Sequence, residues 1–212
     1  MIVDGFTYET EKTSYRYETY EWDRTWVHCA NDFEKTRVLY IGDSISWGTR
    51  EQICGICEDI NFDGLHTSKS LDHPFFRETV DLLVKQLPKV DVVLFNHGHH
   101  SWHLDDGDEY YTHLKSFLSF LLEKFSGKPL FLLLSTYSSD EERCERIRKR
   151  NEITLKVAEE YNLPVIDMYS VSEGNAKNLL DIVHFNAEGY RELAKKLVSE
   201  IYSALPDLKS KK

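Results

Sequence analysis

The feature of this sequence that most restricts its fold is a set of short apolar runs separated by longer amphipathic stretches. Four of the runs are almost continuously apolar, at residues 37–42, 90–96, 129–136 and 163–168. Strands with one solvated face alternate apolar and polar residues, whereas continuous runs of this length are typical of strands buried on both faces. A weaker run lies at residues 59–63. The runs therefore predict a buried parallel sheet of about five strands.

The stretches between these runs have the periodicity of amphipathic helices, with apolar residues recurring every three or four positions. They span residues 73–87, 109–125, 140–162 and 186–205. A regular alternation of strand and helix puts helices on both faces of a parallel sheet. We therefore expect an α/β fold, a three-layer α/β/α sandwich.

The composition limits the number of domains and the classes of partner. A chain of 212 residues fits one sizeable domain, which we place at residues 37–212. Residues 1–36 are rich in Tyr, Glu and Thr and poor in aliphatic residues, so we interpret them as a peripheral segment that lies over the domain. The net charge of −10 argues against nucleic acid and anionic membranes as partners, because both attract positive surfaces.

The sequence also contains no export or membrane signal that we can identify. Its first residues lack the apolar centre of a signal peptide, and no run reaches the roughly 18 apolar residues of a membrane-spanning helix. We therefore expect a cytoplasmic protein without a membrane partner.

Three polar clusters follow predicted strands. Asp43 and Ser44 come directly after the run 37–42, and a histidine-rich cluster begins after the run 90–96. Asp181 and His184 lie between the run 163–168 and the last helix. In open α/β sheets the ligand binds at the carboxyl ends of the strands. These clusters, remote from one another in the chain, are therefore expected to meet at one edge of the sheet.

Ser44, His184 and Asp181 have the side chains of a nucleophilic triad. A serine hydroxyl is a poor nucleophile until a base takes its proton, and imidazole does this near neutral pH. A carboxylate on the other ring nitrogen holds the imidazole in the required tautomer. Taken alone, Ser44 reads as a helix cap and Asp181 as an ordinary loop residue. Their expected meeting at one sheet edge favours the triad.

The motifs "GDS" at 42–44 and "DIVH" at 181–184 resemble those of the SGNH (GDSL-type) hydrolases. This family consists of esterases and lipases on a flavodoxin-like α/β/α fold. The resemblance covers residues 37–205 and implies that Ser44 is the nucleophile, His184 the base and Asp181 its partner. It also implies hydrolysis of an ester, without a cofactor or a metal ion.

The residues that would stabilise the oxyanion are less clearly marked. The family typically uses the Ser backbone N–H, a Gly N–H and an Asn side chain. In "FNHGHHSWH", residues 95–103, His100 stands where that Asn is expected, which resembles a variant branch of the family with His in this block. Asn96 is the alternative side-chain donor. We choose Gly64 as the Gly donor, although a turn residue is an equal interpretation.

The histidine cluster permits a different enzyme. His97, His99, His100 and His103 are good ligands for zinc and similar ions, which activate water without a serine. A metal-dependent hydrolase is therefore the alternative function, but it does not explain "GDS" and "DIVH" together. A binding module without catalysis is a third interpretation, and it requires Ser44, Asp181 and His184 to lie apart.

Trp47 and Trp102 flank the predicted nucleophile and the predicted oxyanion block, where aromatic rings either line a substrate pocket or serve as packing. The chain has no apolar stretch like a lipase lid, so we favour a small acyl group, such as acetyl, on a carbohydrate or another polar alcohol. Arg143, Arg146 and Arg148 on the helix 140–162 either border the pocket or, as we prefer, lie on a solvated face. The sequence does not predict the oligomeric state.

Overall fold

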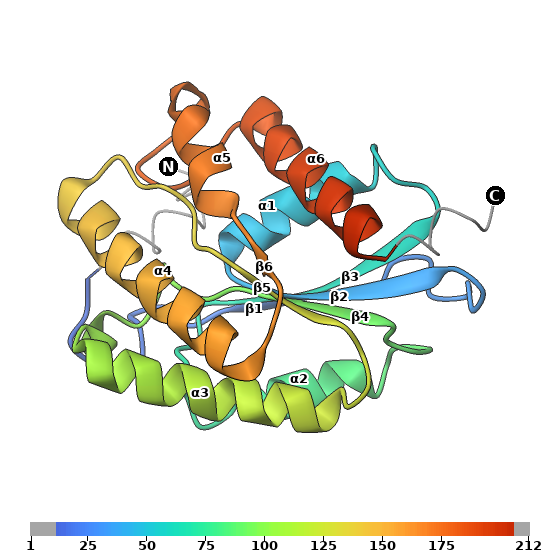
Figure 1. Ribbon diagram of the computed structural model, residues 1–212, viewed down its shortest axis with the longest axis horizontal. Coiled ribbons are helices and arrows are strands. Elements are labelled where there is room, and N and C mark those ends of the chain that lie inside the picture. The colour runs from blue at the N-terminus through green and yellow to red at the C-terminus, as the bar shows by residue number, and fades with distance from the viewer. Residues whose placement is uncertain (1–11, 206–212) are drawn as a thin grey trace.

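The computed structural model describes residues 12–205, which form one mixed six-stranded sheet with helices on both faces (Figure 1). The strand order is β1-β3-β2-β4-β5-β6. The strands are β1 (Asp23–Trp26), β2 (Thr36–Gly42), β3 (Ile60–Thr67), β4 (Val92–Phe95), β5 (Leu130–Leu133) and β6 (Val165–Ile166). The last five run parallel in the order of flavodoxin-like folds, which confirms the predicted sandwich.

The helices form the two outer layers of the sandwich. One face carries α1 (Ser44–Ile53), α5 (Met168–Gly174) and α6 (Ala187–Ala204). The other carries α2 (Phe76–Val84), α3 (Gly107–Lys124) and α4 (Glu141–Tyr161). Short 3-10 turns, η2 (Trp102–Leu104) and η3 (Ala176–Asn178), lie in the connections. Within residues 12–205, no helix has the length and apolarity needed to cross a membrane.

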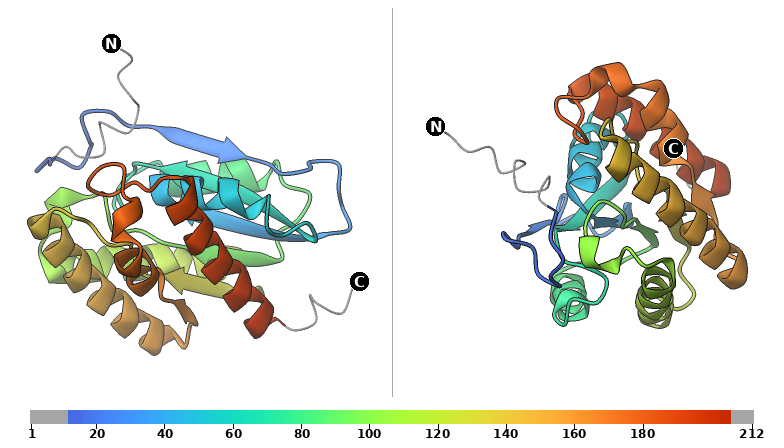
Figure 2. Two further views of the ribbon diagram at one scale, coloured as in Figure 1. Left: turned by 90° about the horizontal axis from the view of Figure 1, so that it is seen from above. Right: turned by 90° about the vertical axis from the view of Figure 1, so that its left-hand side faces the viewer.

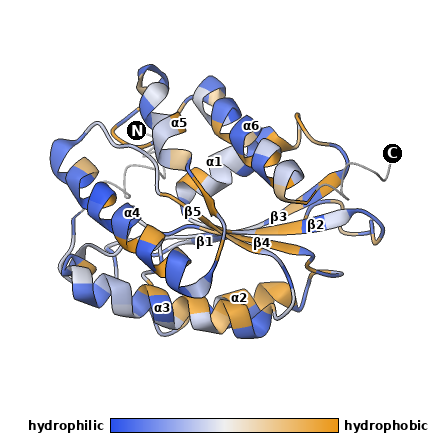
Figure 3. Cartoon of the chain, viewed as in Figure 1, coloured by the Kyte–Doolittle hydropathy of each residue, from blue (hydrophilic) through white to orange (hydrophobic). Residues whose placement is uncertain are grey.

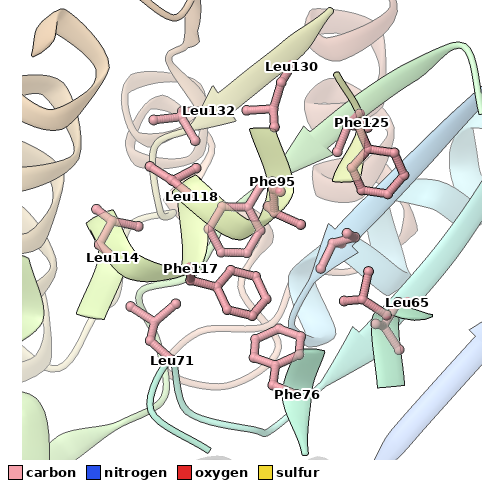
Figure 4. Close-up of a cluster of buried hydrophobic side chains, with 14 of the residues drawn as sticks. Leu65, Leu71, Phe76, Phe95, Leu114, Phe117, Leu118, Phe125, Leu130 and Leu132 are labelled. Carbon is pink, nitrogen blue, oxygen red and sulfur yellow. The ribbon is translucent and has the colours of Figure 1, made fainter. Parts of the chain in front are cut away.

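The central strands β2, β4 and β5 are largely apolar because each face of the sheet packs against its own layer of helices (Figure 3). In β2, Leu39 and Ile41 point towards α2 and α3, whereas Val38 and Tyr40 point towards α1 and α6. The ring of Phe117 lies in the first of these clusters, between those of Phe76 at 4.3 Å and Phe95 at 5.2 Å (Figure 4). Burial of this apolar surface is the main favourable contribution to folding.

Most of the helices begin at a side-chain cap. Asp43, Asp106, Asp140, Asp167 and Asn186 each accept a hydrogen bond from a backbone N–H of the first helical turn, in α1, α3, α4, α5 and α6 respectively. These caps satisfy donors that a helix start leaves without a partner, and each contributes on the order of 1 kcal/mol. They fix the points at which the chain leaves the sheet edge.

The N-terminal strap (residues 12–26) lies along the sheet and ends as its edge strand β1 (Figure 2). β1 pairs antiparallel with β3, so Trp26 is opposite Gly64. The sequence "DRTW" is exposed along its length and has no apolar run, which is why periodicity did not identify this sixth strand. The division of the chain at residue 36 stays a prediction, and residues 1–11 lie outside the described residues.

β3 is longer than the run 59–63 that predicted it. It is buried throughout, continues to Thr67 and pairs with β2 so that His66 is opposite Gly42. Gly64, which we expected to follow this strand, therefore lies inside it between β2 and β1. The misplacement arises because "INFDGLHT" mixes polar and apolar residues, which hides a buried strand from a hydropathy pattern.

Candidate active site

Ser44 stands at the carboxyl end of the central strand β2. β2 ends at Gly42, Asp43 caps the helix, and Ser44 is the first residue of α1. A Cβ atom on Gly42 would lie 2.1 Å from Asn96 Oδ1, so only glycine lets the chain after β4 approach here. Ser44 is 2% exposed. The strand and helix thus hold a buried hydroxyl at the edge where ligands bind in this architecture.

Ser44, His184 and Asp181 form a hydrogen-bonded series. The Ser44 hydroxyl lies 2.8 Å from His184 Nε2, across 140 residues of sequence. On the other side of the ring, His184 Nδ1 lies 2.7 Å from Asp181 Oδ2. With the Nδ1–H donating to the carboxylate, Nε2 of a neutral ring is free of a proton and can accept from the hydroxyl. The structure therefore brings the three predicted catalytic residues together.

The loop that carries Asp181 and His184 is fixed by its own short-range contacts. Leu179 and Phe185 form an isolated antiparallel bridge, and the Leu180 N–H donates to the His184 carbonyl at 2.7 Å. Asp181 Oδ1 accepts the N–H groups of Val183 and His184, both at 2.8 Å. This Asx-type turn is what directs a carboxylate and an imidazole three residues apart to the same side.

The same contacts keep the Asp181 carboxylate charged. Burial by itself would raise the pKa of Asp181, but hydrogen bonds from the His184 ring and from the N–H groups of His184 and Val183 lower it to about 2. Hydrogen bonds that favour the ionised form have this effect. Asp181 is therefore an acceptor for the imidazole at any pH near neutrality.

A second buried serine–histidine contact lies nearby and differs from the first in one respect. Ser46 Oγ is 2.6 Å from His66 Nδ1 and donates its own proton to the Asp43 carbonyl, also at 2.6 Å. His66 Nε2 is buried and has no hydrogen-bond partner among residues 12–205. Burial, with the charges of Arg50 and Arg24, lowers the pKa of His66 well below its usual value. Without a carboxylate on its ring, His66 lacks the orienting group that His184 has.

The loop after β4, residues 96–105, is held by buried arginines of α4. Arg143 donates to the His99 carbonyl, and Arg146 donates to the carbonyls of His99 and His100. Arg150 donates to the carbonyls of Gly98, His100, Ser101 and Leu104. The side chains of Arg146 and Arg150 also pair with the Asp105 carboxylate.

This arrangement corrects our expectation of a solvated arginine face. Arg143 and Arg146 are 0% and 7% exposed, and Arg150, which we did not single out, is 3% exposed. Only Arg148 has a largely exposed side chain. Residues 143, 146 and 150 lie on one face of a helix, so their i, i+3, i+7 spacing was a signal of burial that net polarity concealed.

The histidines of this loop do not converge on a common point. His97 Nε2 contacts the Lys69 carbonyl at 3.1 Å, and His99 Nε2 contacts Thr136 Oγ1 at 3.0 Å. His103 contacts Asp72 at 3.0 Å, and His100 Nδ1 contacts Glu18 at 2.8 Å. Among residues 12–205, no group of three His, Cys, Asp or Glu side chains is placed to hold a metal ion.

Burial, with the charge of a neighbouring arginine, lowers the pKa of His97 and of His99 well below the usual range. In His97 the main charge is that of Arg150, and in His99 that of Arg143. Both imidazoles are therefore neutral, which suits the hydrogen bonds that anchor them in the loop.

The other predicted site residues have different surroundings. Asn96 is 5% exposed, its N–H donates to the Ile41 carbonyl at 3.1 Å, and its Oδ1 has no partner in the described part of the chain. Gly64 leaves space for the His66 ring, because a Cβ there would lie 2.2 Å from His66 Nε2. Gly64 thus belongs to the interior of the sheet, whereas Asn96 borders the strand end that precedes Ser44.

The two tryptophans also differ. Trp47 lies one turn after Ser44 on α1, and the Arg24 guanidinium stacks 3.3 Å from the centre of its ring. Trp102 is 8% exposed and packs against Arg143 and Arg146. It lines a pocket of about 250 Å³ between α3 and α4, but none of the three triad side chains lines that pocket. Of the two tryptophans, only Trp47 is a sequence neighbour of Ser44, whereas Trp102 belongs to a separate pocket.

The chain is similar in sequence and in fold to known proteins. The model of the GDSL-like lipase/acylhydrolase family matches residues 40–192. No curated protein sequence matches the chain significantly. Among solved structures, a lipolytic protein of the G-D-S-L family from Veillonella parvula superposes with a TM-score of 0.63 at 21% identity, covering 79% of this chain and 98% of that one.

Two further structures share the fold at lower identity. An acetylxylan esterase from Geobacillus stearothermophilus has a TM-score of 0.62 at 19% identity, covering 78% of this chain and 94% of that one. The catalytic domain of peptidoglycan O-acetyltransferase A from Streptococcus pneumoniae has a TM-score of 0.62 at 16% identity, covering 81% and 96%. Since the family model covers most of the chain, the protein belongs to the GDSL-like lipase/acylhydrolase family and is a hydrolase of ester bonds.

Proposed function

We propose that the protein is a serine esterase that removes short acyl groups, acetyl in particular, through Ser44, His184 and Asp181. The observation that supports this most directly is the series of contacts from Ser44 Oγ to His184 Nε2 at 2.8 Å and from His184 Nδ1 to Asp181 at 2.7 Å. Nucleophile, base and orienting carboxylate are all within the distances that proton transfer requires.

The reaction has two acyl-transfer steps. Ser44 Oγ attacks the carbonyl carbon of the ester while His184 Nε2 takes the hydroxyl proton. The tetrahedral intermediate collapses, the bond to the alcohol oxygen breaks, and His184 gives its proton to that oxygen. A water molecule then attacks the acyl-enzyme, with His184 again accepting a proton, and the acid leaves as Ser44 regains its hydrogen. Asp181 stays ionised and stabilises the imidazolium in each step.

The Ser44 N–H, the Asn96 side chain and the His100 ring are the proposed donors to the oxyanion. The Ser44 N–H lies at the start of α1, where backbone N–H groups favour negative charge. Asn96 is in contact with the strand end before Ser44, and the arginines of α4 fix the loop that carries His100. We leave Gly64 out of this set because it lies inside β3.

Two observations support a small acyl group on a polar alcohol. Ser44 and His184 are only 2% and 3% exposed, which leaves little room for a long chain. Solved structures with this fold include acetylxylan esterases. We therefore propose an acetylated carbohydrate as the substrate class, with Trp47, one turn from the nucleophile, as the aromatic residue placed to contact a sugar ring.

Replacement of the nucleophile tests the proposal. We expect Ser44→Ala to lower kcat on p-nitrophenyl acetate by at least about 10⁴-fold and to abolish labelling by a fluorophosphonate probe. Ser46→Ala is the matched control, because it removes the hydroxyl of the other buried serine–histidine contact and should remain active. Hydrolysis should also decrease from acetate to longer acyl esters.

The alternative interpretations predict different results. Full activity in Ser44→Ala, with loss of activity on chelation, would indicate a metal-dependent hydrolase. No hydrolysis of any short ester, with Ser44 unreactive to the probe in the wild-type protein, would contradict the esterase and favour a binding module. A preference for long acyl chains would retain the triad and reject the acetyl substrate.

A further inference from the structure

The N-terminal strap carries a buried carboxylate to the loop after β4. Glu18 Oε1 lies 2.8 Å from His100 Nδ1, across 82 residues of sequence. Both side chains are buried, with 7% of Glu18 and 1% of His100 exposed. Burial of a charged carboxylate is costly unless a hydrogen-bonded partner compensates it. Glu18 lies 19 residues before the predicted start of the domain at residue 37. The placement of its carboxylate against one imidazole therefore requires a structural or chemical reason.

The geometry of this contact repeats that of Asp181 and His184. In both couples a carboxylate oxygen contacts Nδ1 of a buried imidazole, at 2.7 Å in the triad and 2.8 Å here. His100 is also fixed through its main chain, because its carbonyl accepts from Arg146 at 2.7 Å and from Arg150 at 2.5 Å. The ring is therefore held from the strap on one side and from α4 on the other.

The strap itself is fastened at several other points. Arg16 pairs with Asp72 at 3.1 Å, Glu21 Oε2 lies 3.5 Å from His73 Nε2, and Asp23 pairs with Lys69. The Glu18 N–H donates to Glu21 Oε1 at 2.9 Å, which orients the residue towards the loop. These contacts give Glu18 a defined position rather than one of many surface conformations.

The contact restricts what the His100 ring can donate. When Nδ1–H donates to the carboxylate, Nε2 of a neutral ring carries no proton and can only accept. The ring can donate from Nε2 to a developing oxyanion only as the imidazolium. A charged donor binds an oxyanion about twice as strongly as a neutral one. A carboxylate on Nδ1 is the group that favours this charged form.

We propose that Glu18 is a positioning residue for catalysis, which holds His100 as an imidazolium that donates from Nε2 to the oxyanion. This inference rests on the proposed esterase function and adds a residue of the N-terminal strap to its machinery. Other charged groups act on the same ring. Glu21 of the strap favours the imidazolium, whereas Arg146 and Arg150 of α4 oppose it. The neighbouring imidazoles of His97 and His99 are neutral and add no charge. Glu18 is the group in direct contact and opposes these cations.

The test compares Glu18→Gln with Asp23→Asn. Both variants remove one negative charge from the strap, but Asp23 contacts Lys69 and Thr67 rather than His100. Histidine side-chain NMR, assigned with His100→Asn, should show the titration midpoint of His100 at lower pH in Glu18→Gln and unchanged in Asp23→Asn. This measurement does not depend on activity, so it stands even if the protein hydrolyses none of the esters tested.

Kinetics tests the catalytic part of the inference. Loss of the imidazolium should lower activity at alkaline pH, so the alkaline limb of the kcat profile should move to lower pH in Glu18→Gln. We expect kcat to fall by about 10- to 100-fold at that limb, less than the 10²–10³ of a deleted donor, with KM nearly unchanged. In the His100→Asn background, Glu18→Gln should have no further effect on the profile.

Three results would overturn the inference. An unchanged His100 titration in Glu18→Gln would show that the carboxylate does not control the ring. An unchanged kcat profile in Glu18→Gln would mean that Glu18 is only a structural contact. The same conclusion would follow if Glu18→Gln lowered kcat equally in the wild-type and His100→Asn backgrounds. If Glu18→Gln does not fold, the kcat profile of His100→Asn tests the inference. This variant should lack the alkaline limb, and a retained limb would overturn the inference. Failure of the esterase itself is seen separately, as absence of Ser44 labelling in the wild-type protein.

Discussion

Two loops at the carboxyl edge of the sheet are held in place by different kinds of contact. The loop before α6 is fixed within residues 179–186, by the Leu179–Phe185 bridge and the turn around Asp181. The loop after β4 is fixed by partners far away in the chain, namely arginines 44 to 52 residues later and Glu18, 82 residues earlier. A locally determined loop can be recognised from a short motif, whereas the other depends on a complete fold.

The two loops are also expected to respond differently to mutation. In the loop before α6 the polar contacts orient reacting groups and involve a partly exposed carboxylate. In the loop after β4 the polar contacts satisfy buried backbone carbonyls. Loss of these hydrogen bonds destabilises the fold, because a buried acceptor is then left without a donor. We therefore expect loss of the Asp181 contacts in the first loop to act on turnover, and loss of the arginine contacts in the second to act on stability.

The largest expected effect is that of Asp181→Asn on turnover. Asparagine can still accept the N–H groups of Val183 and His184, but it no longer fixes the imidazole in the tautomer that accepts from Ser44. We expect kcat on p-nitrophenyl acetate to fall by about 10⁴-fold, which corresponds to about 5.5 kcal/mol of transition-state stabilisation. The free energy of unfolding at neutral pH, measured in urea, should fall by only about 1 kcal/mol. An active Asp181→Asn variant would mean that another group orients His184.

The next effect is that of Arg150→Leu on stability. Leucine leaves the carbonyls of Gly98, His100, Ser101 and Leu104 without this donor in a buried environment. We expect the free energy of unfolding to fall by about 3–5 kcal/mol in urea titrations. Arg150→Lys keeps the charge but not the planar fork of donors. Its free energy of unfolding should therefore lie between those of the leucine variant and the wild type.

Arg148→Leu is the matched control on the same helix. Its side chain is 53% exposed, so its replacement should change the free energy of unfolding by less than about 0.5 kcal/mol. Equal losses in Arg148→Leu and Arg150→Leu would contradict the view that buried carbonyls, rather than helix charge, make the loop after β4 dependent on α4.

These contrasts also explain how much of the protein could be predicted from its sequence. The continuous apolar runs gave the parallel sheet and the two outer layers, because burial on both faces leaves a direct trace in hydropathy. The exposed strand "DRTW" and the second half of β3 leave no such trace. Gly64 was misplaced for this reason, because the apolar run ends at residue 63, four residues before β3 ends at Thr67.

The candidate site divides in the same way. Ser44, Asp181 and His184 could be named in advance, because their motifs stand at the ends of recognisable elements. Arg150 and Glu18 could not, because their partners are backbone carbonyls and one imidazole in a loop whose position only the fold determines. From the sequence alone, charged residues are expected to lie on a solvated surface. Arg150 and Glu18 are instead buried in the folded chain, which the sequence pattern does not indicate.

The smallest predicted effect is a pH dependence of stability from Asp181. Its pKa in the folded protein is lowered to about 2, whereas an unfolded Asp titrates near about 3.9. A group with a lowered folded pKa stabilises the native state above its unfolded pKa, and this contribution is lost as the pH falls towards the folded pKa. Because 37% of the side chain is exposed, solvent screening reduces the contribution to the order of 1 kcal/mol.

Asp181→Asn isolates this contribution from those of the other carboxylates. Between about pH 5 and pH 2 the wild-type protein should lose about 1 kcal/mol more stability than the variant, as measured by urea unfolding at a series of pH values. Above about pH 5 the two curves should run parallel, because the carboxylate is fully ionised in both the folded and the unfolded chain. Curves that stay parallel down to pH 2 would mean that the turn around Asp181 holds its geometry without favouring the ionised carboxylate. The loop before α6 would then be fixed by its backbone bridge alone, and the contrast with the charge-dependent loop after β4 would be sharper than the present contacts indicate.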